Sequence, residues 1–577
     1  MGRLKGAMIH KVLGTELLPL RERPLHDQDE DTYVSLFKDV LKSGPMYFSY
    51  GIDLTSSFQR QSRSSTNDPL WMRTDDRFFW NKFISSDLMD FKSGGGNSSG
   101  LRLNSGPQPG VDPFILPVIC GMMNLTRTSI KGNTLTFALV TRRSRHRTGT
   151  RYFSRGIDEN GNVSNFNETE QIIALNDNDL VPNDSFSSFD RKSSAGGSRD
   201  VQILSYVQTR GSVPVYWAEI NKLKYTPELQ IRGVESAVNA AQKHFAEQIQ
   251  IYGDNYLVNL VNQKGREKRV KDAYEQMIRM LQSAPTEEVA KDKKSPETVH
   301  IVESTDPKQQ FDRLHYVYFD FHNETKGLKW HRAQLLLDEL HEALLKQQYF
   351  HGVYNVNDRS GRVDVRNSQR SVVRTNCMDC LDRTNVVQSM LGRFAINRML
   401  HDLQLIGRGE TAQEDGAFEN LFRNIWADNA DVVSRSYSGT GALKTDFTRT
   451  GNRTRAGALQ DLSNSITRYV RNNFADGPRQ DGFDLFSGAY LPSSSTIGGA
   501  FMDRRPVSIQ AMPYILAASL FFITVASATT RMPDATIWPL RMLMVLFLAV
   551  AAYCGNFIIS HGPLYVSKLS NDTRSRL

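Results

Sequence analysis

The chain has 577 residues, of which 40% are apolar, so it is long enough for two or three domains with real hydrophobic cores. Its formal charge of +8 is mild for this length, which argues against nucleic acid as a partner. Four cysteines are too few for a disulfide framework, and their scarcity agrees with a reducing cytosol.

Residues 1–140 combine strand-like runs, such as ILPVICGMM and LTFALVT, with a few helical ones. A stretch rich in glycine, serine and proline at residues 93–110 interrupts them, as expected of a surface insertion. This part of the chain therefore predicts a small mixed α/β domain at the N-terminus.

In residues 141–490, strand-like segments such as VQILSYV and HYVYFDF alternate with helical patterns such as ESAVNAAQKHFAEQIQ. Such alternation predicts an α/β catalytic domain built on a central sheet. Residues 192–199 and 285–296 have the composition of exposed loops. Residues 491–508, which contain PSSSTIGG, predict a linker to the next part of the chain.

Two uncharged apolar segments follow, YILAASLFFITVASATT and MLMVLFLAVAAYCGNFII. With their flanking residues, each is long enough to cross a hydrocarbon core of about 30 Å. Two buried core helices are the alternative, although adjacent uncharged runs of this length are unusual in soluble folds. Because the connector is short, we expect a hairpin of two transmembrane helices within residues 509–560. Residues 561–577 would then form a short tail on the same side as the linker.

Charged residues beside the two segments predict the orientation of the hairpin. Cations on the linker and tail side outnumber those on the connector side: Arg504, Arg505, Lys568, Arg574 and Arg576 against Arg531 and Arg541. Positive charge is retained in the cytoplasm, so we expect the catalytic region and both termini to be cytoplasmic.

The most informative segment is SVVRTNCMDCLDRTNVVQSMLGRF, in which a β-branched run leads into a polar loop and then a helical pattern. Five residues separate Cys377 from Arg383, a spacing that lets backbone N–H groups surround one tetrahedral anion at the start of the helix. The same donors favour a thiolate, so we expect a lowered pKa and a nucleophilic sulfur at Cys377. Arg383 would close the ring by holding two phosphoryl oxygens.

Other residues of this loop have expected roles as well. The hydroxyl of Thr384 would steady the sulfur or assist breakdown of a cysteinyl-phosphate. The remaining loop positions would bind substrate through the cradle that they form around the phosphate: Asn376, Met378, Cys380 and Leu381.

A C-x5-R spacing alone is weak evidence, because an ordinary buried thiol would satisfy it. The full string RTNCMDCLDRTN, however, resembles the signature of the Sac family of phosphoinositide phosphatases, R-T-N-C-x-D-C-L-D-R-T-N, at every fixed position. Segments between residues 7 and 481 are also similar to this family, among them RGSVPVYW, IYGDNYLVNLVNQKGREK, YFDFHNETKGLKW and NNFADGPRQD. Family members usually carry further residues ahead of MIHKVLGTELLPL, so we expect a shortened N-terminal domain.

The resemblance implies a membrane phosphatase that removes phosphate from phosphatidylinositol monophosphates, above all the 4-phosphate and also the 3-phosphate. It implies residence in the endoplasmic reticulum and Golgi, with which the short spans agree. The expected partners are the lipid substrate, an anionic membrane surface and proteins of lipid metabolism. No cofactor or metal is expected, because loop amides and Arg383 would neutralise the phosphate. A phosphoprotein phosphatase with the same loop and a catalytically idle membrane scaffold are the alternatives.

The proton donor for the leaving group is open between two carboxylates. Asp379 is the first candidate and Asp382 the rival, because a carboxylate beside a thiolate and a phosphate would have a raised pKa. The alternative is that one of the two only fixes the loop through backbone N–H groups. Asp320 and His322 could also reach the pocket, although a histidine after a strand is more often structural.

Two basic stretches are expected to face anionic lipid, with salt bridges to nearby acids as the alternative. Lys444 and Arg449 of the second stretch are predicted to contribute to substrate binding. The two stretches consist of Arg142, Arg143, Arg145, Arg147, Arg151 and Arg155, and of Lys444, Arg449, Arg453 and Arg455.

Cys377 and Cys380 form a C-x-x-C pair, but no second pair is spaced to complete a zinc site. A redox role for Cys380, trapping oxidised Cys377 as a reversible disulfide, is a further hypothesis.

Overall fold

A computed structural model describes residues 2–18, 28–64, 68–93, 109–177, 200–289, 299–305, 309–326, 330–355, 362–451, 454–492, 505–528 and 537–567, with residues 501 and 503. The predicted surface insertion at 93–110, the loop at 192–199 and most of the PSSSTIGG linker lie outside these residues.

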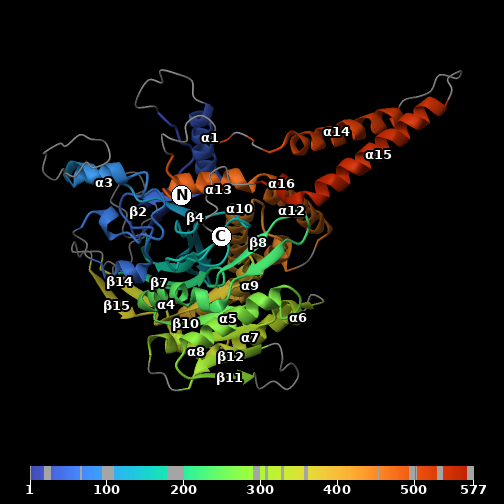
Figure 1. Cartoon of the computed structure of the whole chain (residues 1–577). Coiled ribbons are helices and arrows are strands. Elements are labelled where there is room, and N and C mark those ends of the chain that lie inside the picture. The colour runs from blue at the N-terminus through green and yellow to red at the C-terminus, as the bar shows by residue number, and fades with distance from the viewer. Residues whose placement is uncertain are drawn as a thin grey trace.

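Within the described residues, one mixed sheet of 14 strands forms the centre of the protein (Figure 1). The strand order is β1-β2-β3-β4-β5-β6-β7-β16-β10-β13-β12-β11, and β14 pairs with both β7 and β15. The strands are β1 (Gly2–Leu4), β2 (Ala7–Lys11), β3 (Met46–Ser49), β4 (Ile119–Ile130), β5 (Asn133–Arg143), β6 (Asn167–Leu175), β7 (Val201–Arg210), β10 (Asp254–Asn259), β11 (Pro285–Val289), β12 (Val299–Ser304), β13 (Leu314–Phe319), β14 (Phe350–Tyr354), β15 (Val363–Asn367) and β16 (Ser371–Asn376). Strands β8 (Trp217–Ile220) and β9 (Glu228–Ile231) form a separate pair.

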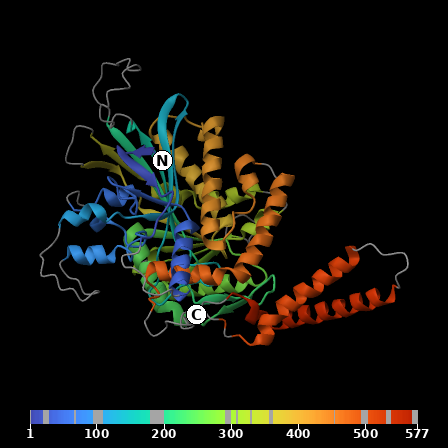
Figure 2. The same ribbon diagram turned by 90° about the horizontal axis from the view of Figure 1, so that it is seen from above.

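Helices cover both faces of the sheet, and a further pair, α14 and α15, projects from the body (Figure 1). They are α1 (Gln28–Ser43), α2 (Phe58–Gln61), α3 (Ser86–Lys92), α4 (Val238–Tyr252), α5 (Glu267–Leu281), α6 (Phe321–Glu324), α7 (Gln334–Glu339), α8 (His341–Gln347), α9 (Asp382–Asp402), α10 (Gly416–Ser438), α11 (Thr445–Thr450), α12 (Arg455–Phe474), α13 (Asp476–Ser487), α14 (Val507–Ala528), α15 (Trp538–Ser560) and α16 (Gly562–Tyr565). Successive side chains of β10 point to opposite faces of the sheet, so they show which helices pack on each face. Val258 packs in a core with side chains of α9 and α10, whereas Leu257 packs in a second core with α4 and α5. The golden helices of residues 382–438 can be followed in Figure 2.

The predicted α/β alternation is confirmed in the strands and helices that flank the C-x5-R loop. β16 lies between β7 and β10 and is parallel to both. The loop therefore leaves the carboxyl end of a central parallel strand, the edge at which α/β sheets usually place their ligands. The predicted division at residue 140 falls inside β5, whose pairing continues the sheet on both sides. That division stays a prediction.

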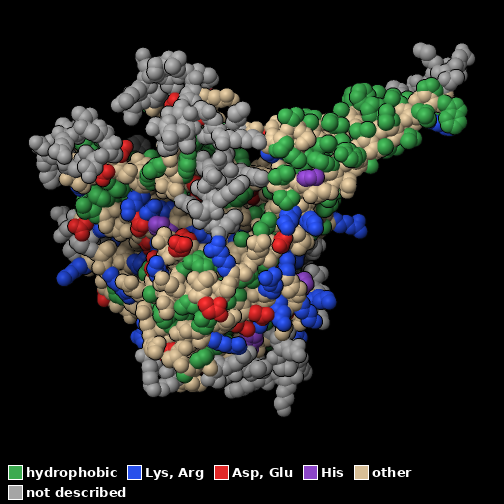
Figure 3. Space-filling model, viewed as in Figure 1, with side chains coloured by type: hydrophobic (Ala, Val, Ile, Leu, Met, Phe, Trp, Pro, Cys, Tyr) green, Lys and Arg blue, Asp and Glu red, His purple; other side chains and the backbone are tan. Residues whose placement is uncertain are grey.

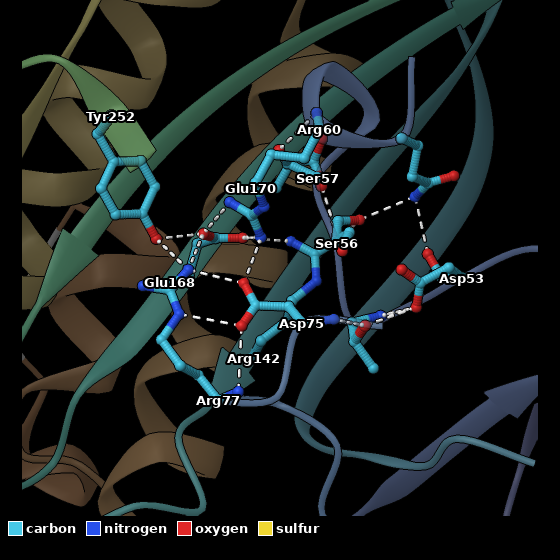
Figure 4. Close-up of polar contacts among 12 residues, drawn as sticks. Asp53, Ser56, Ser57, Arg60, Asp75, Arg77, Arg142, Glu168, Glu170 and Tyr252 are labelled. Atoms are coloured by element: carbon cyan, nitrogen blue, oxygen red, sulfur yellow. Dashed lines mark hydrogen bonds and ion pairs between the residues drawn. The ribbon is translucent and has the colours of Figure 1, made fainter. Parts of the chain in front are cut away.

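A buried cluster of charges joins the N-terminal part of the chain to the sheet (Figure 4). Arg60 donates to Glu168 at 2.6 Å, and Arg142 donates to Glu168 at 3.0 Å and to Glu170 at 2.7 Å. Tyr252 of α4 also donates its hydroxyl to Glu168. A cleft of about 410 Å³ opens beside this cluster, lined by Arg60 and Arg77 among others, and does not include the C-x5-R loop.

The expectation that the first basic stretch faces lipid is wrong for three of its members, because Arg142, Arg143 and Arg155 are all buried. Arg142 is only 2% exposed because its guanidinium is taken up by two glutamates of the neighbouring strand β6. Arg143 is 3% exposed and lies over the rings of Trp80 and Phe483. Since a buried guanidinium needs hydrogen-bond partners inside the protein, these side chains stabilise the fold instead.

Helices α14 and α15 pair along their length and project from the body as a hairpin (Figure 1). The two ends of the hairpin meet at the body, where Arg505 donates to the backbone oxygen of Leu564 at 3.0 Å. The two predicted apolar segments therefore form paired helices whose outer ends lie together at the body, and the placement of both ends on one side of a membrane stays a prediction. Most of the flanking cations used for the predicted orientation, which are Arg504, Arg531, Lys568, Arg574 and Arg576, lie outside those residues.

Candidate active site

The loop from Cys377 to Leu381 connects β16 to α9, as the sequence predicts. The end of β16 is fixed by Asn376, whose side chain donates to Asn259 at 2.7 Å and whose backbone oxygen accepts from Leu260 at 2.8 Å. Cys380 has a φ of 52°, a left-handed conformation that turns the chain sharply before the helix. Its backbone N–H donates to the Cys377 sulfur at 3.2 Å.

The electrostatics of the loop favour a thiolate at Cys377, whose side chain is 3% exposed. Hydrogen bonding from Cys380 lowers the pKa of the Cys377 thiol to about 6, against the opposing effect of burial. The charge of Arg383 and the buried hydroxyl of Thr384 lower this pKa as well, while the charge of Asp379 raises it. A pKa near 6 leaves most of the sulfur ionised at neutral pH, so it can act as a nucleophile.

A further positive charge, that of Arg210, lies close to the two cysteines of the loop. Arg210 ends β7 beside β16, in register with Thr375, and it is fully buried. Burial lowers the pKa of Arg210 to about 10, although the nearby Cys380 and Cys377 oppose this change. The next residue, Gly211, accepts a hydrogen bond from the Cys380 thiol at 3.2 Å. Because Arg210 carries a buried cation close to both cysteines, it favours negative charge on the sulfur.

Arg383 is held from the side of α5, and its predicted role in closing the ring around a phosphoryl group stays a prediction. Its guanidinium donates to both carboxylate oxygens of Glu267 at 3.1 Å, to the backbone oxygen of Leu260 at 2.9 Å and to Asn262 at 2.8 Å. The sequence could not show this, because Glu267 comes from α5 and reaches Arg383 only through the fold. Arg383 still lies close enough to Cys377 to lower its pKa.

The expectation of a raised pKa is wrong for Asp379. Arg151 donates to its carboxylate at 2.8 Å and Arg155 at 2.6 Å. Burial acts to raise the pKa of Asp379, but the attraction of the two arginines holds it well below its usual range. Asp379 is therefore ionised, and it fixes the loop against the segment that follows β5.

Asp382 has the opposite environment. Burial raises the pKa of its carboxyl above the ordinary value, and the charge of Arg468 and the N–H of Leu443 oppose this only in part. The Leu443 N–H donates to the carboxylate at 2.8 Å. Of the two candidate acids, Asp382 thus has the environment that favours a proton.

The other predicted residues are distributed around this centre. Met378 and Leu381 are buried in apolar clusters, and the backbone oxygen of Met378 accepts from Arg155 at 2.9 Å. Lys444 is exposed and donates its backbone N–H to Asp461 at 3.0 Å. Arg449 binds Asp428 of α10 at 2.7 Å and so lies in a different network from the loop.

Asp320 and His322 have mainly structural surroundings. The Asp320 side chain accepts from the N–H of Asn323 at 3.1 Å and so caps α6, while His322 is exposed. No group of three histidine, cysteine, aspartate or glutamate side chains is arranged to hold a metal ion in the part of the chain that the structure describes.

Four residues that the sequence did not single out for the site prove to contact its loop or its acids. Arg151 and Arg155 bind Asp379, Glu267 binds Arg383, and Arg468 acts on Asp382. Glu267 lies in one of the segments that resemble the family, and Arg151 and Arg155 belong to the first basic stretch, whereas no signal in the sequence pointed to Arg468. Their partners depend on distant parts of the chain being brought together.

Comparisons with known proteins show the family to which the chain is related. Residues 1–326 match a family model described as the SacI homology domain. The chain is 42% identical over 533 residues to "Phosphatidylinositol-3-phosphatase SAC1" of Saccharomyces cerevisiae, an alignment that covers 92% of this chain and 75% of that protein. The chain belongs to the Sac family of phosphoinositide phosphatases. Two further Sac relatives are "Phosphatidylinositol-3-phosphatase SAC1" of Drosophila melanogaster and "Phosphoinositide phosphatase SAC7" of Arabidopsis thaliana. The first is 37% identical over 87% of this chain and 72% of its own length, and the second is 33% identical over 86% and 71%.

The carboxyl end fits a membrane-anchored Sac phosphatase. Among the described residues, α14 and α15 are long and apolar enough to cross a membrane. Only 11% of the most apolar part of α14 and 6% of that of α15 are buried in the protein. A soluble core helix would be mostly buried, and these two are not.

Proposed function

We propose that this protein hydrolyses phosphatidylinositol monophosphates to phosphatidylinositol, chiefly the 4-phosphate and also the 3-phosphate. The observation that carries the proposal is the Cys377 thiol, whose pKa is lowered to about 6 at the carboxyl end of a central strand in a Sac family chain. The names of the Saccharomyces and Drosophila relatives specify the 3-phosphate for those proteins. The preference for the 4-phosphate is the part that the substrate assay below must decide.

In the proposed reaction, the Cys377 thiolate attacks phosphorus and forms a sulfur–phosphorus bond while the bond to the inositol oxygen breaks. The leaving oxygen takes a proton from a carboxylic acid of the site. Water then attacks the cysteinyl-phosphate, gives a proton back to the carboxylate, and releases inorganic phosphate and the thiolate. Arg383 would bind the charge that spreads over the phosphoryl oxygens.

Asp382 is the proposed general acid, because burial raises its pKa while Asp379 is held ionised by two arginines. Asp379 is then a positioning residue. It holds the loop against Arg151 and Arg155 and so keeps the sulfur in place.

We expect Asp382→Asn to lower turnover of a phosphoinositide by about 100-fold, the usual contribution of a general acid. The same variant should hydrolyse p-nitrophenyl phosphate almost normally, because nitrophenolate leaves without a proton. The matched variant Asp379→Asn should impair both substrates alike. Steady-state rates on the two substrates measure this, and the reverse pattern would assign the acid to Asp379.

The substrate class is tested with the full-length protein in detergent micelles. Phosphate release is measured on short-chain phosphatidylinositol 3-, 4- and 5-phosphates and on a soluble phosphotyrosine peptide, with Cys377→Ser as the blank. We expect the highest kcat/KM on the 4-phosphate, a lower value on the 3-phosphate and negligible release from the peptide. Preferred cleavage of the peptide would indicate a phosphoprotein phosphatase, and release from no substrate would indicate a scaffold.

The hairpin and the family together support a membrane enzyme with a cytoplasmic catalytic region. Residence in the endoplasmic reticulum and Golgi, and partners among the proteins of lipid metabolism, belong to the same proposal.

A further inference from the structure

Helix α12 is amphipathic, but its apolar side chains face outward and its polar side chains face the protein. Five apolar side chains recur at a spacing of three or four residues and therefore share one face of the helix. All five are about half exposed or more: Leu459 68%, Leu462 57%, Ile466 57%, Val470 48% and Phe474 52%. An exposed apolar face of this size is unusual for a soluble surface and marks a site of interaction.

The opposite face of α12, which packs against the protein, is polar. The buried residues on this face are Arg468 and Asn472. Arg468 donates to Thr440 at 3.0 Å and to the backbone oxygen of Gly441 at 2.9 Å. Asn472 donates to Asp476 at 2.8 Å. The helix is thus held in place by hydrogen bonds, and its hydrophobic side chains are left outward.

The position of α12 indicates what its apolar face meets. The helix lies at the base of the membrane hairpin, beside α16 (Figure 1). Ser567, which follows α16, donates its N–H to the backbone oxygen of Asn473 at 2.6 Å and accepts from the N–H of Gly477 at 2.7 Å. The segment that follows the second apolar helix is therefore hydrogen-bonded to the carboxyl end of α12 and to the residues after it. Because the hairpin would enter the bilayer near this point, the carboxyl end of α12 lies close to the expected bilayer surface.

We propose that α12 lies in the surface of the same bilayer that the hairpin crosses, with its five apolar side chains in the boundary between headgroups and acyl chains. An amphipathic helix buries its apolar face about 5–10 Å into this boundary. Arg455 and Arg471 are exposed on the same helix and suit an anionic lipid surface. Figure 3 shows the apolar surface of the hairpin and cationic side chains on the body beside its base.

This arrangement couples membrane contact to the catalytic loop. Arg468, on the inner face of α12, acts on Asp382, and it binds the turn at Thr440 and Gly441 that leads to Leu443. Binding of α12 to lipid would therefore hold Arg468 and the turn at residues 440–443 in place beside Asp382, the proposed acid. A substrate in the bilayer would meet the loop at the membrane surface.

The first test measures depth, and it does not depend on phosphatase activity. Full-length protein carrying Ile466→Cys and Cys377→Ser is labelled with the fluorophore NBD and reconstituted in nanodiscs of phosphatidylcholine and phosphatidylserine. We expect quenching by lipids that carry a doxyl group near the headgroup, about two-fold stronger than by lipids with a deep doxyl group. The matched control is Val365→Cys in β15, which is 42% exposed and should not be quenched.

Emission typical of water at position 466 would overturn the proposal. So would a blue-shifted emission that doxyl lipids do not quench, because a second protein surface would then cover the helix.

The second test uses Ile466→Glu, a change at an exposed position outside the catalytic loop. We expect hydrolysis of phosphatidylinositol 4-phosphate in the nanodisc bilayer to fall about ten-fold, while hydrolysis of the soluble dibutanoyl analogue is unchanged. Val365→Glu should affect neither substrate. Equal loss on both substrates would contradict the proposal, and absence of hydrolysis in the wild-type protein would count against the proposed function alone.

Discussion

Replacing Cys377 by serine is expected to lower the rate of phosphate release by at least about 1,000-fold. A serine hydroxyl cannot be ionised by this environment near neutral pH, whereas the pKa of the Cys377 thiol is lowered to about 6. The volume and the hydrogen bonds of the loop change little, so the lipid should still bind. Single-turnover hydrolysis and binding of the short-chain 4-phosphate measure the two effects separately.

Cys380→Ser is the matched control, because Cys380 lies in the same loop and burial raises the pKa of its thiol well above the ordinary value. This variant should keep substantial activity, because the serine hydroxyl can donate to the Cys377 sulfur in place of the Cys380 thiol. Comparable loss in both variants would mean that the loop had been disrupted rather than the nucleophile removed.

The same prediction has a pH dependence of known sign. The thiolate fraction of Cys377 rises with pH and reaches one half at about pH 6, where the pKa lies. Alkylation by iodoacetamide should therefore follow a titration curve centred near pH 6, while an ordinary thiol titrates near about pH 8.5. The Cys377→Ser variant should lack this curve, and a midpoint near 8.5 in the wild-type protein would contradict a stabilised thiolate.

The second large effect is expected at Arg383. We expect Arg383→Lys to lower kcat by about 100-fold or more, because a lysine cannot hold two equatorial phosphoryl oxygens as the charge spreads in the transition state. The matched control is Arg398→Lys, on the same helix α9, where the arginine binds the backbone oxygens of Leu344 and Leu345. That control should retain nearly full kcat.

A substitution of Glu267, the carboxylate that binds Arg383, is a second test of the role of this arginine. Its carboxylate accepts from both terminal nitrogens of the Arg383 guanidinium, so Glu267 and a phosphoryl group compete for the same two donors. Removing the competing charge with Glu267→Gln should lower the KM for the lipid by a few-fold while Arg383→Lys lowers kcat. A rise in KM would instead mean that Glu267 holds Arg383 in its productive position.

The features that depend only on contiguous residues could be predicted from the sequence. The strand, loop and helix around Cys377 follow from a β-branched run, a polar turn and a helical repeat, and all three are found at β16 and α9. The apolar segments of α14 and α15 are equally local, because their length and lack of charge alone suit a bilayer. Family membership also followed from one contiguous motif.

The role of each charged side chain could be assigned only from the fold. Arg142 became a buried partner of glutamates, whereas Arg151 and Arg155 reached Asp379 and reversed its expected pKa shift. The outward apolar face of α12 likewise depends on which side of that helix meets the body. The physical reason is that a charge or an apolar face takes its role from its surroundings, which come from segments far apart in the chain, so local patterns cannot contain them.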